Sequence, residues 1–196
     1  MTKLILTVAA TLLLSGASVL ADFSKQDAAD LDRVSEALNA IHSLKGEFVQ
    51  QDPNGTTEEG EVYIQKPGKM RFEYKPPSAV LIVSDGSEVA VFNRKLNTVD
   101  RYPLWTTPLN LLLSDHVNFA RSTKILGIAH ENGTLVIRAR SNSSRINGNI
   151  TIVFSDPGLE LKQWTVVDAQ GLATTVVLRG VQTGVALQPD LFQTHS

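Results

Sequence analysis

The stretch from Glu59 to Gly86 constrains the fold more than any other part of the chain, because it reads as short strands joined by tight turns. Apolar and polar residues alternate along residues 60–65 and again along residues 69–75, and a period of two gives a strand one apolar and one polar face. The intervening sequence KPGK has the residues of a type II turn, in which proline presets one φ angle and glycine supplies a positive one. The stretch therefore predicts an antiparallel meander with one buried face.

Strand patterns recur along the rest of the chain. Before the meander, residues 46–51 form a first short run. Residues 79–83 are the third run of the meander, the hairpin turn Asp85-Gly86 leads into residues 88–92, and residues 98–102 follow. Further strands are predicted at Lys124–Ala129, Thr134–Arg140, Asn149–Phe154, Leu159–Val167 and Leu172–Leu178. The segments between them are rich in Gly, Asn, Asp and Pro, which favour turns. Near-regular spacing with short turns predicts an up-and-down antiparallel sheet.

Two segments break the strand pattern and predict helices. Residues 22–44 carry an apolar stripe at helical spacing, formed by Leu31, Val34, Leu38 and Ile41. Residues 104–115 predict a short second helix, with Thr107 as N-cap and Pro108 at the first helical position. The apolar side chains that share a face of this second helix are Leu109, Leu112 and Leu113.

Length and element count together predict the architecture. A chain of 196 residues favours a single domain, here residues 22–196. The fold class is mainly β (α+β), a curved antiparallel sheet of about 11 strands that forms an unclosed β-barrel. Two or three α-helices cover its concave side, so that an apolar wall faces an apolar lid. Incomplete packing between the two would leave a dry pocket.

The N-terminus has the pattern of a secretory signal peptide. Lys3 is followed by an apolar run over residues 4–14, and Val19-Leu20-Ala21 fits the small-residue cleavage rule. We expect residues 1–21 to be removed after Ala21 and the remainder to be exported as a soluble protein.

Several function classes lack support in the sequence. A net charge of −2 argues against nucleic acid as a partner, and the absence of cysteine excludes disulfides and thiolate metal sites. The four histidines, His42, His116, His130 and His195, show no metal-ligand spacing. No nucleophile elbow or glycine-rich phosphate loop is present. The sequence therefore predicts no catalytic residue, no metal and no cofactor.

Four segments carry a resemblance to a known family. They are residues 46–50 (GEFVQ), 59–74 (EGEVYIQKPGKMRFEY), 83–86 (VSDG) and 107–109 (TPL), in matching order and spacing. The chain resembles the periplasmic outer-membrane lipoprotein carriers of the LolA type, over essentially all of residues 22–196. The resemblance implies an unclosed β-barrel with a helical lid over an apolar cavity. It also implies a periplasmic monomer that takes triacylated lipoproteins from an inner-membrane ABC transporter and delivers them to an outer-membrane receptor, if one is present.

The resemblance also implies roles for individual residues. The cavity wall is expected to include Phe48, Val62, Ile64, Met70, Phe72, Val89 and Val91. The lid faces are expected to be Leu31, Val34 and Leu38 on the first helix and Leu109, Leu112 and Leu113 on the second. Related carriers commonly have an arginine where Lys66 stands, and that arginine holds the lid shut by hydrogen bonds to helix carbonyls. Lysine lacks the planar fork, so either Lys66 closes the lid more weakly or another group, such as Arg71, assists.

Three alternatives remain on the sequence alone. The same half-barrel could bind or sense another acyl-chain ligand, such as a lipid or lipopolysaccharide. It could be a regulatory periplasmic domain with a packed interior, in which the same apolar residues are ordinary core. It could be a small esterase that acts on acyl substrates, although no nucleophile site is evident.

Overall fold

The structure is a computed structural model that describes residues 24–143, 146 and 148–195. The predicted signal peptide, residues 1–21, lies outside the described residues, so its cleavage stays a prediction. No helix in the described part of the chain is long and apolar enough to cross a bilayer.

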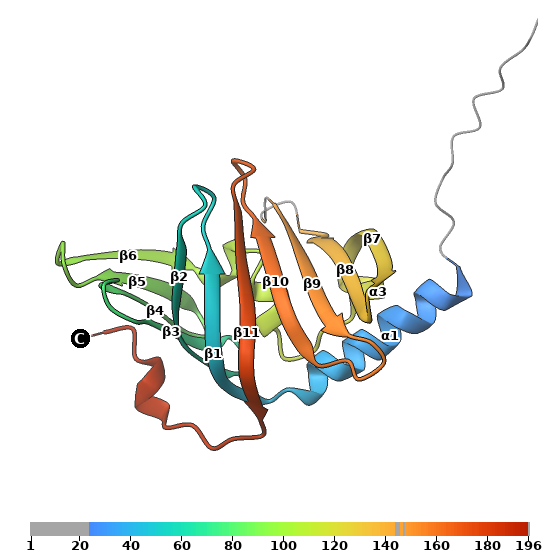
Figure 1. Ribbon diagram of the computed structural model, residues 1–196, viewed down its shortest axis with the longest axis horizontal. Helices are drawn as coiled ribbons and strands as arrows, with labels where there is room; N and C mark the ends of the chain where they lie inside the picture. Colours follow the sequence, from blue (N-terminus) through green and yellow to red (C-terminus); the bar gives the residue numbers. More distant parts are fainter. Residues whose placement is uncertain (1–23, 144–145, 147, 196) are drawn as a thin grey trace, which may run out of the picture.

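One antiparallel sheet of eleven strands forms the body of the protein, and it does not close into a barrel (Figure 1). The strands are β1 (Ser43–Gln51), β2 (Thr57–Gln65), β3 (Lys69–Tyr74), β4 (Val80–Asp85), β5 (Glu88–Asn93), β6 (Thr98–Pro103), β7 (Thr123–Glu131), β8 (Thr134–Ser141), β9 (Asn149–Ser155), β10 (Leu161–Val167) and β11 (Ala173–Thr183). Their order in the sheet is β6-β5-β4-β3-β2-β1-β11-β10-β9-β8-β7. The predicted fold class, an unclosed barrel of about 11 strands, is confirmed.

Two meanders make up this sheet, and a single long-range pairing joins them. Within each meander every strand pairs with its neighbours in the sequence. The pairing of β1 with β11 connects the meanders, running from Leu44 opposite Thr183 to Gln51 opposite Thr175, with an irregularity between Lys45 and Glu47. The two halves of the chain therefore form the two sides of one curved sheet, with β1 and β11 at its middle.

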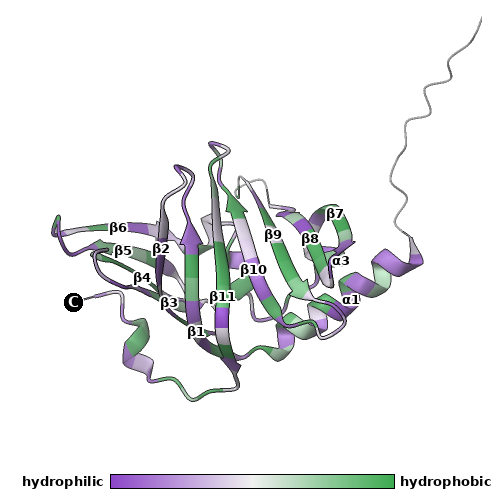
Figure 2. Cartoon of the chain, in the orientation of Figure 1, coloured by the Kyte–Doolittle hydropathy of each residue, from purple (hydrophilic) through white to green (hydrophobic). Residues whose placement is uncertain are grey.

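Burial follows the predicted alternation along the strands. In β3, Met70, Phe72 and Tyr74 are buried while the residues between them are partly exposed. Figure 2 shows the same alternation of apolar and polar residues along β1, β9 and β10. The turn before β3 has Gly68 at a φ of 72°, as predicted, but the amide of Lys69 donates to the carbonyl of Pro67. The hydrogen-bonded turn is thus one residue tighter than the predicted type II turn.

The first helix, α1 (Lys25–Ala40), ends four residues earlier than predicted, and residues 22 and 23 of the predicted helix lie outside the described residues. Ser24 caps it: the Ser24 hydroxyl accepts from the amide of Asp27, and the Asp27 carboxylate accepts from the amide of Ser24. The prediction of helix to residue 44 was wrong, because Leu44 already belongs to β1 and lies opposite Ile64 of β2. The buried side chain of Leu44 continues the apolar stripe of the helix into the strand. Periodicity alone therefore did not locate the boundary between α1 and β1.

The predicted second helix is broken into two short pieces, a 3-10 turn η1 (Leu104–Thr106) and α2 (Asn110–Leu113). Thr107 is not the N-cap, because its hydroxyl donates back to the carbonyl of Leu104. A third short helix, α3 (Phe119–Ser122), was not predicted, and Asn118 caps it with its side chain. A 3-10 turn, η2 (Pro189–Phe192), lies against β3 and β4 near the C-terminus.

An aromatic cluster packs over a glycine in the first meander. The ring of Phe48 meets those of Phe72 and Tyr74 edge-on, with centroids 4.9 and 5.0 Å apart. Gly60 lies opposite Phe48 on one side and opposite Tyr74 on the other. A Cβ atom on Gly60 would lie 2.1 Å from the carbonyl oxygen of Glu73 and 2.7 Å from the Phe48 ring. The cluster therefore requires glycine at this position.

We expect Gly60→Ala to lower the free energy of unfolding by about 2 kcal/mol or more, because the methyl group overpacks a rigid site. Gly127→Ala in β7 is the matched control, since a Cβ atom there meets nothing within 4 Å. The control change should stay within about 0.5 kcal/mol of the parent. Urea unfolding followed by circular dichroism measures both, and equal effects of the two substitutions would contradict this account of the cluster.

Candidate functional site

An apolar cavity of about 120 Å³ opens between the two halves of the sheet and the start of α2. Its lining is formed by Gln50, Met70, Phe72, Tyr74, Ile82, Leu109, Trp164, Val166, Thr174 and Val176. Phe72 from the first meander and Trp164 from the second meet edge-on across it, with ring centroids 6.1 Å apart. The hydroxyl of Tyr74 donates to the side-chain oxygen of Gln50, so the buried phenol is satisfied within the wall. Burial raises the pKa of that phenol, which keeps the wall uncharged.

Of the seven predicted wall residues, some line the cavity and the others lie in the core beside it. Met70 and Phe72 line the cavity directly. Phe48, Val62, Ile64 and Val89 are buried in the core that adjoins it, and Val91 is half-buried against that core. In this state of the molecule those five residues do not line the cavity, and their contact with a ligand stays a prediction.

Sequence reasoning missed the part of the wall that comes from the second meander. Trp164, Val166, Thr174 and Val176 lie on β10 and β11, and Trp164 is opposite Val176 in the register. Period-two alternation places these side chains on the inner face. It does not reveal which strand lies across the sheet from β3. The pairing of β1 with β11 decides that.

The predicted lid residues lie on the helices that cover the sheet. Leu31, Val34 and Leu38 of α1 and Leu112 and Leu113 of α2 are buried in the common core, and half-buried Leu109 borders the cavity. A second depression, of about 410 Å³, lies under the C-terminal end of α1, where Ala37, Ala40 and Ile41 face β10 and β11. Both depressions therefore border the helices that carry the predicted lid residues.

The turn at residues 66–68 is bonded to the C-terminal ends of both lid helices. The Nζ atom of Lys66 donates to the carbonyl of Leu38 in α1 at 2.8 Å, and the amide of Lys66 donates to the carbonyl of His42 at 2.9 Å. The amide of Gly68 donates to the carbonyl of Leu113 in α2 at 2.9 Å. A cation at a helix C-terminus is also favoured by the helix dipole. Two of the three bonds reach the ends of α1 and α2 and the third reaches His42 just after α1, so together they join both helices to the turn between β2 and β3.

Burial lowers the pKa of Lys66 to about 8, while Asp115 acts in the opposite direction. The ammonium group is thus only weakly favoured in this half-buried position. Arg71, the other predicted latch residue, is bonded differently. Its guanidinium donates to the Glu73 carboxylate at 2.8 Å and to the carbonyl of Leu191 in η2 at 3.3 Å. Arg71 therefore holds the C-terminal segment in this structure, and any assistance to the lid stays a prediction.

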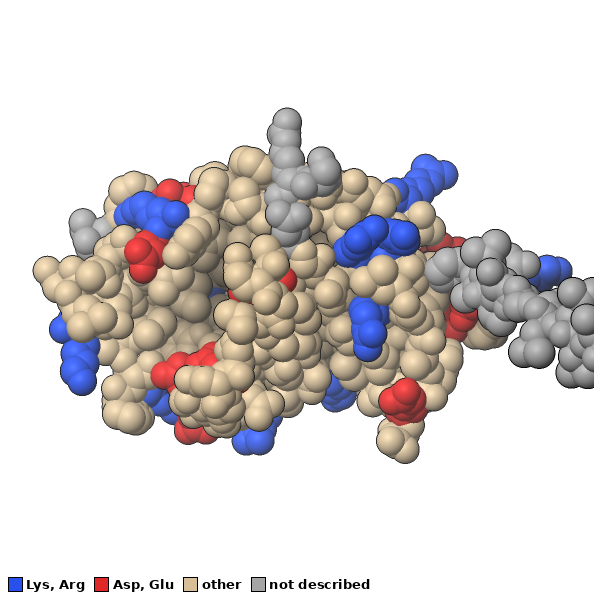
Figure 3. Space-filling view, turned by 90° about the horizontal axis from the view of Figure 1, so that it is seen from above, with Lys and Arg blue, Asp and Glu red and all other residues tan. Residues whose placement is uncertain are grey.

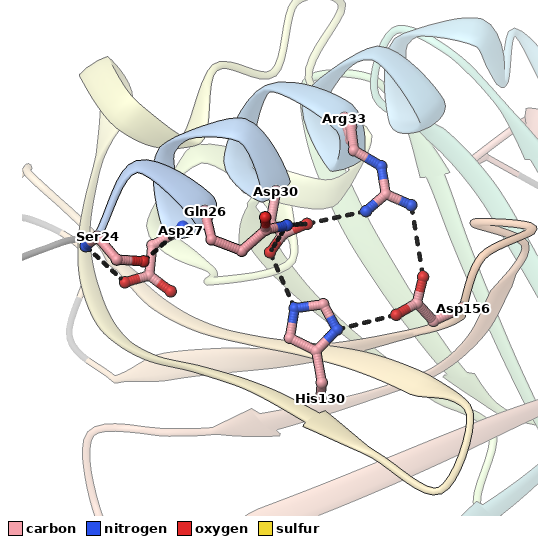
Figure 4. A network of polar contacts seen from close by, with 7 residues as sticks. All are labelled: Ser24, Gln26, Asp27, Asp30, Arg33, His130 and Asp156. Atoms are coloured by element: carbon pink, nitrogen blue, oxygen red, sulfur yellow. Dashed lines mark hydrogen bonds and ion pairs between the residues drawn. The ribbon is translucent and has the colours of Figure 1, made fainter.

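A polar network attaches the N-terminal half of α1 to the sheet (Figure 4). The two ring nitrogens of His130, in β7, lie 2.8 Å from a carboxylate oxygen of Asp30 and 2.8 Å from one of Asp156. Arg33 donates to Asp30 at 2.8 Å and to Asp156 at 3.4 Å. Ionised carboxylates only accept hydrogen bonds, so both ring nitrogens of His130 carry hydrogen when both contacts are made. The geometry thus favours the imidazolium ion.

The electrostatics of the network agree with its geometry. Hydrogen bonds to Asp30 and Asp156 raise the pKa of His130. Burial alone would raise the pKa of Asp30, but hydrogen bonds from His130, Gln26 and Arg33 outweigh it and lower that pKa. The hydrogen bond from His130 likewise lowers the pKa of Asp156. No group of described residues has the arrangement of a metal site.

Comparison with known proteins gives a consistent relationship. The sequence model of the family described as "Outer membrane lipoprotein carrier protein LolA" matches residues 39–195. The chain is 27% identical over 179 residues to the outer-membrane lipoprotein carrier protein of Methylococcus capsulatus, covering 87% of this chain and 85% of the relative. It is 30% identical over 162 residues to that of Chromobacterium violaceum, covering 79% and 78%. A crystal structure of a DUF1329 family protein from Desulfovibrio piger shares the fold, with a TM-score of 0.53 and 11% identity over 86% of this chain and 96% of that one.

We expect Lys66→Met to loosen the lid, because methionine keeps an apolar stem and loses the donor to Leu38. The amides at the end of α1 should exchange with solvent about fivefold faster or more, the effect of losing about 1 kcal/mol of hydrogen bonding. Hydrogen exchange followed by mass spectrometry measures this. Lys69→Met is the control, since the Lys69 side chain makes no hydrogen bond or ion pair with another described residue. Unchanged exchange in Lys66→Met would remove Lys66 from lid closure.

We expect the N-terminal half of α1 to open more readily as pH rises from 5.5 to 8.5. The raised pKa of His130 means that its charge stabilises the closed lid below its ordinary value of 6.5, and that this contribution is lost above the raised value. The lowered pKa values of Asp30 and Asp156 place the corresponding acid loss below about pH 4. Exchange of the amides of residues 27–35, corrected for the intrinsic pH effect, measures the opening.

The His130→Gln variant should show little of this pH dependence, because glutamine does not titrate. His116→Gln is the control, since the His116 side chain is 90% exposed and lies outside the network. A pH dependence that survives His130→Gln, or that disappears in the control, would assign the effect to another group.

Proposed function

The chain belongs to the outer membrane lipoprotein carrier protein LolA family, and from this premise we propose that it carries lipoproteins with their acyl chains held between the sheet and the lid helices. Carriers of this family are periplasmic and are not enzymes. We further propose that this chain is exported after cleavage at Ala21, accepts triacylated lipoproteins from an inner-membrane lipoprotein-releasing ABC transporter, and delivers them to the outer membrane, through a receptor where one exists.

The observation that carries this proposal is the apolar cavity that borders a lid held by a few polar bonds. The walls are aromatic and aliphatic, and the few polar groups, Gln50, Tyr74 and Thr174, lie among them. Such a lining suits hydrocarbon and offers no charge to a polar ligand. Each buried methylene contributes about 0.8 kcal/mol, so one sixteen-carbon chain gains roughly 12 kcal/mol on leaving water. A carrier for such chains needs apolar area and does not need specific polar contacts.

The size of the cavity supports a closed resting lid. A cavity of roughly 150 Å³ accommodates a molecule the size of benzene. The cavity of about 120 Å³ is therefore too small for even one long acyl chain in this state. Loading requires the helices to move away from the sheet, which would expose the inner residues Phe48, Val62 and Ile64 that are core here. The bonds of Lys66 and the His130 network are what such a movement has to break.

Trp164 provides a direct test of loading. The chain has two tryptophans, Trp164 in the cavity wall and Trp105 half-exposed on η1, so Trp105→Phe leaves a single reporter. A triacylated lipopeptide with brominated acyl chains should quench Trp164, and an unbrominated lipopeptide should reverse the quenching. The deacylated peptide should not compete. No quenching would refute acyl binding in this cavity, and equal competition by a plain phospholipid would favour a general acyl-chain binder over a lipoprotein carrier.

Val166→Phe, made in the Trp105→Phe protein, should lower the affinity for the brominated lipopeptide about tenfold, because the larger side chain fills the cavity. Quenching of Trp164 measures this affinity. Val167→Phe is the matched control: it is the next residue on β10, is also half-buried, and points to the other face. If both substitutions weakened binding equally, the ligand would lie elsewhere.

A further inference from the structure

Four exposed cations lie together near one edge of the sheet, on α3, β7 and β8. They are Arg121, Lys124, Arg138 and Arg140. None of the four side chains has an ion pair or hydrogen bond with another described residue, whereas Arg33, Arg71, Lys75 and Arg101 all pair with carboxylates. We call these four residues the basic edge. In a chain with a net charge of −2, this edge concentrates unpaired positive charge.

Within the basic edge, two positively charged side chains are direct cross-strand neighbours. Lys124 lies directly opposite Arg140 in the pairing of β7 with β8, so their side chains share the outer face of the sheet. Like charges in such a pair destabilise a sheet unless an anion lies between them. A depression of about 410 Å³ adjoins both side chains, and Ser141 and Asn142 also line it. The side-chain nitrogen of Asn142 already donates to the carbonyl of Arg121 at 3.1 Å, so the two cations and the Ser141 hydroxyl are the groups left to bind an anion such as a phosphate group.

The basic edge lies at the same end of the sheet as the rim of the acyl cavity. Thr174 and Val166 of the cavity are paired with each other, and the register continues through Ile150 and Ala139 to Ile125. Lys124 and Arg140 are the next residues along β7 and β8. β8 and β11 are three strands apart, which corresponds to about 14 Å. Figure 3 looks onto this end and shows a hollow in the surface, with Lys and Arg side chains on both sides of it.

We propose that the basic edge binds the phosphate headgroups of anionic phospholipids and so sets the mouth of the cavity against a membrane surface. This proposal rests on the proposed carrier function, because acyl cargo enters or leaves a membrane only where the two meet. Leu126, which is 43% exposed on β7 beside Lys124, adds an apolar contact at the headgroup level. A protein with an acidic surface would also attract the basic edge. Such a partner would not explain why the exposed Leu126 and the rim of the cavity lie at the same end of the sheet.

Vesicle flotation tests the proposal. We expect the protein to bind vesicles containing 30% phosphatidylglycerol in phosphatidylcholine, and to bind pure phosphatidylcholine far less. Because each Lys or Arg near an anionic surface contributes about fivefold in affinity, Lys124→Gln/Arg138→Gln/Arg140→Gln should lower binding on the order of 100-fold. Raising the salt concentration should weaken binding by the parent protein. The parent and all variants have the same N-terminus, so any contribution of residues 1–21 to vesicle binding is the same in each.

Lys25→Gln/Lys95→Gln/Arg179→Gln is the control, since these three cations are also exposed and without a described ion pair but lie elsewhere. It should keep binding within about threefold of the parent. Equal loss in both triple variants, or no preference for anionic vesicles, would overturn the proposal, and the second result would favour an acidic protein partner. The quenching of Trp164 by brominated lipopeptide in detergent should be unchanged in the basic-edge variant. If the parent protein showed no quenching, the result would refute the carrier function and not the proposed membrane contact.

Discussion

The pairing of β1 with β11 is the interaction on which the rest of the structure depends. All other strand pairs in the described sheet join sequence neighbours and can form locally, whereas this pair joins residues about 130 positions apart. It places the first meander opposite the second, so that Phe72 meets Trp164 across the cavity. Gly46 sits in this pairing, where a Cβ atom would lie 3.0 Å from the carbonyl oxygen of Arg179. Without this close contact between strands the chain would form two separate curved sheets, each with an uncovered apolar face.

The lid is attached in a way that suits displacement. Its apolar side chains are buried, but they face a sheet that leaves cavities on both sides of the contact. Polar side-chain bonds join α1 to the described sheet and its turns at two places, through Lys66 at the C-terminal end and through His130 and Arg33 near the N-terminal end. Asn39 and Ser35 of α1 are bonded instead to the segment before and at the start of α3. Because the bonds to the sheet and its turns involve charged groups, each contributes about 1.5–3 kcal/mol, which is still small because water replaces the bond when it breaks. Under the proposed function, a small number of such bonds holds α1 against the sheet and still allows it to leave when an acyl chain offers more apolar contact.

Local patterns in the sequence predicted the strands well and the helix ends and cavity less well. Alternation identified Met70, Phe72 and Tyr74 as one face of β3, and the capping residues Ser24 and Asp27 were visible in the sequence although the predicted helix began before them. Leu44 fits the stripe of α1 equally well as helix or strand, and only its pairing with Ile64 decides. Trp164 entered the wall through long-range register, for which no short segment carries a signal. The resemblance to lipoprotein carriers pointed to Lys66, whereas the His130 network joins residues 30, 130 and 156, which no local pattern connects.

The hydrogen bond from Lys66 to Leu38 has a consequence for how the protein can change over evolution. The acceptors of this bond and of the bond from the neighbouring Gly68 amide are main-chain carbonyls of residues 38 and 113. Every amino acid supplies that oxygen, so substitutions on the lid helices leave the fastening in place as long as the helices keep their ends. The apolar side chains on the inner faces of α1 and α2 can therefore be substituted without loss of these bonds. Under the proposed function, that inner surface is free to diversify with the acyl cargo while the attachment at the turn is kept.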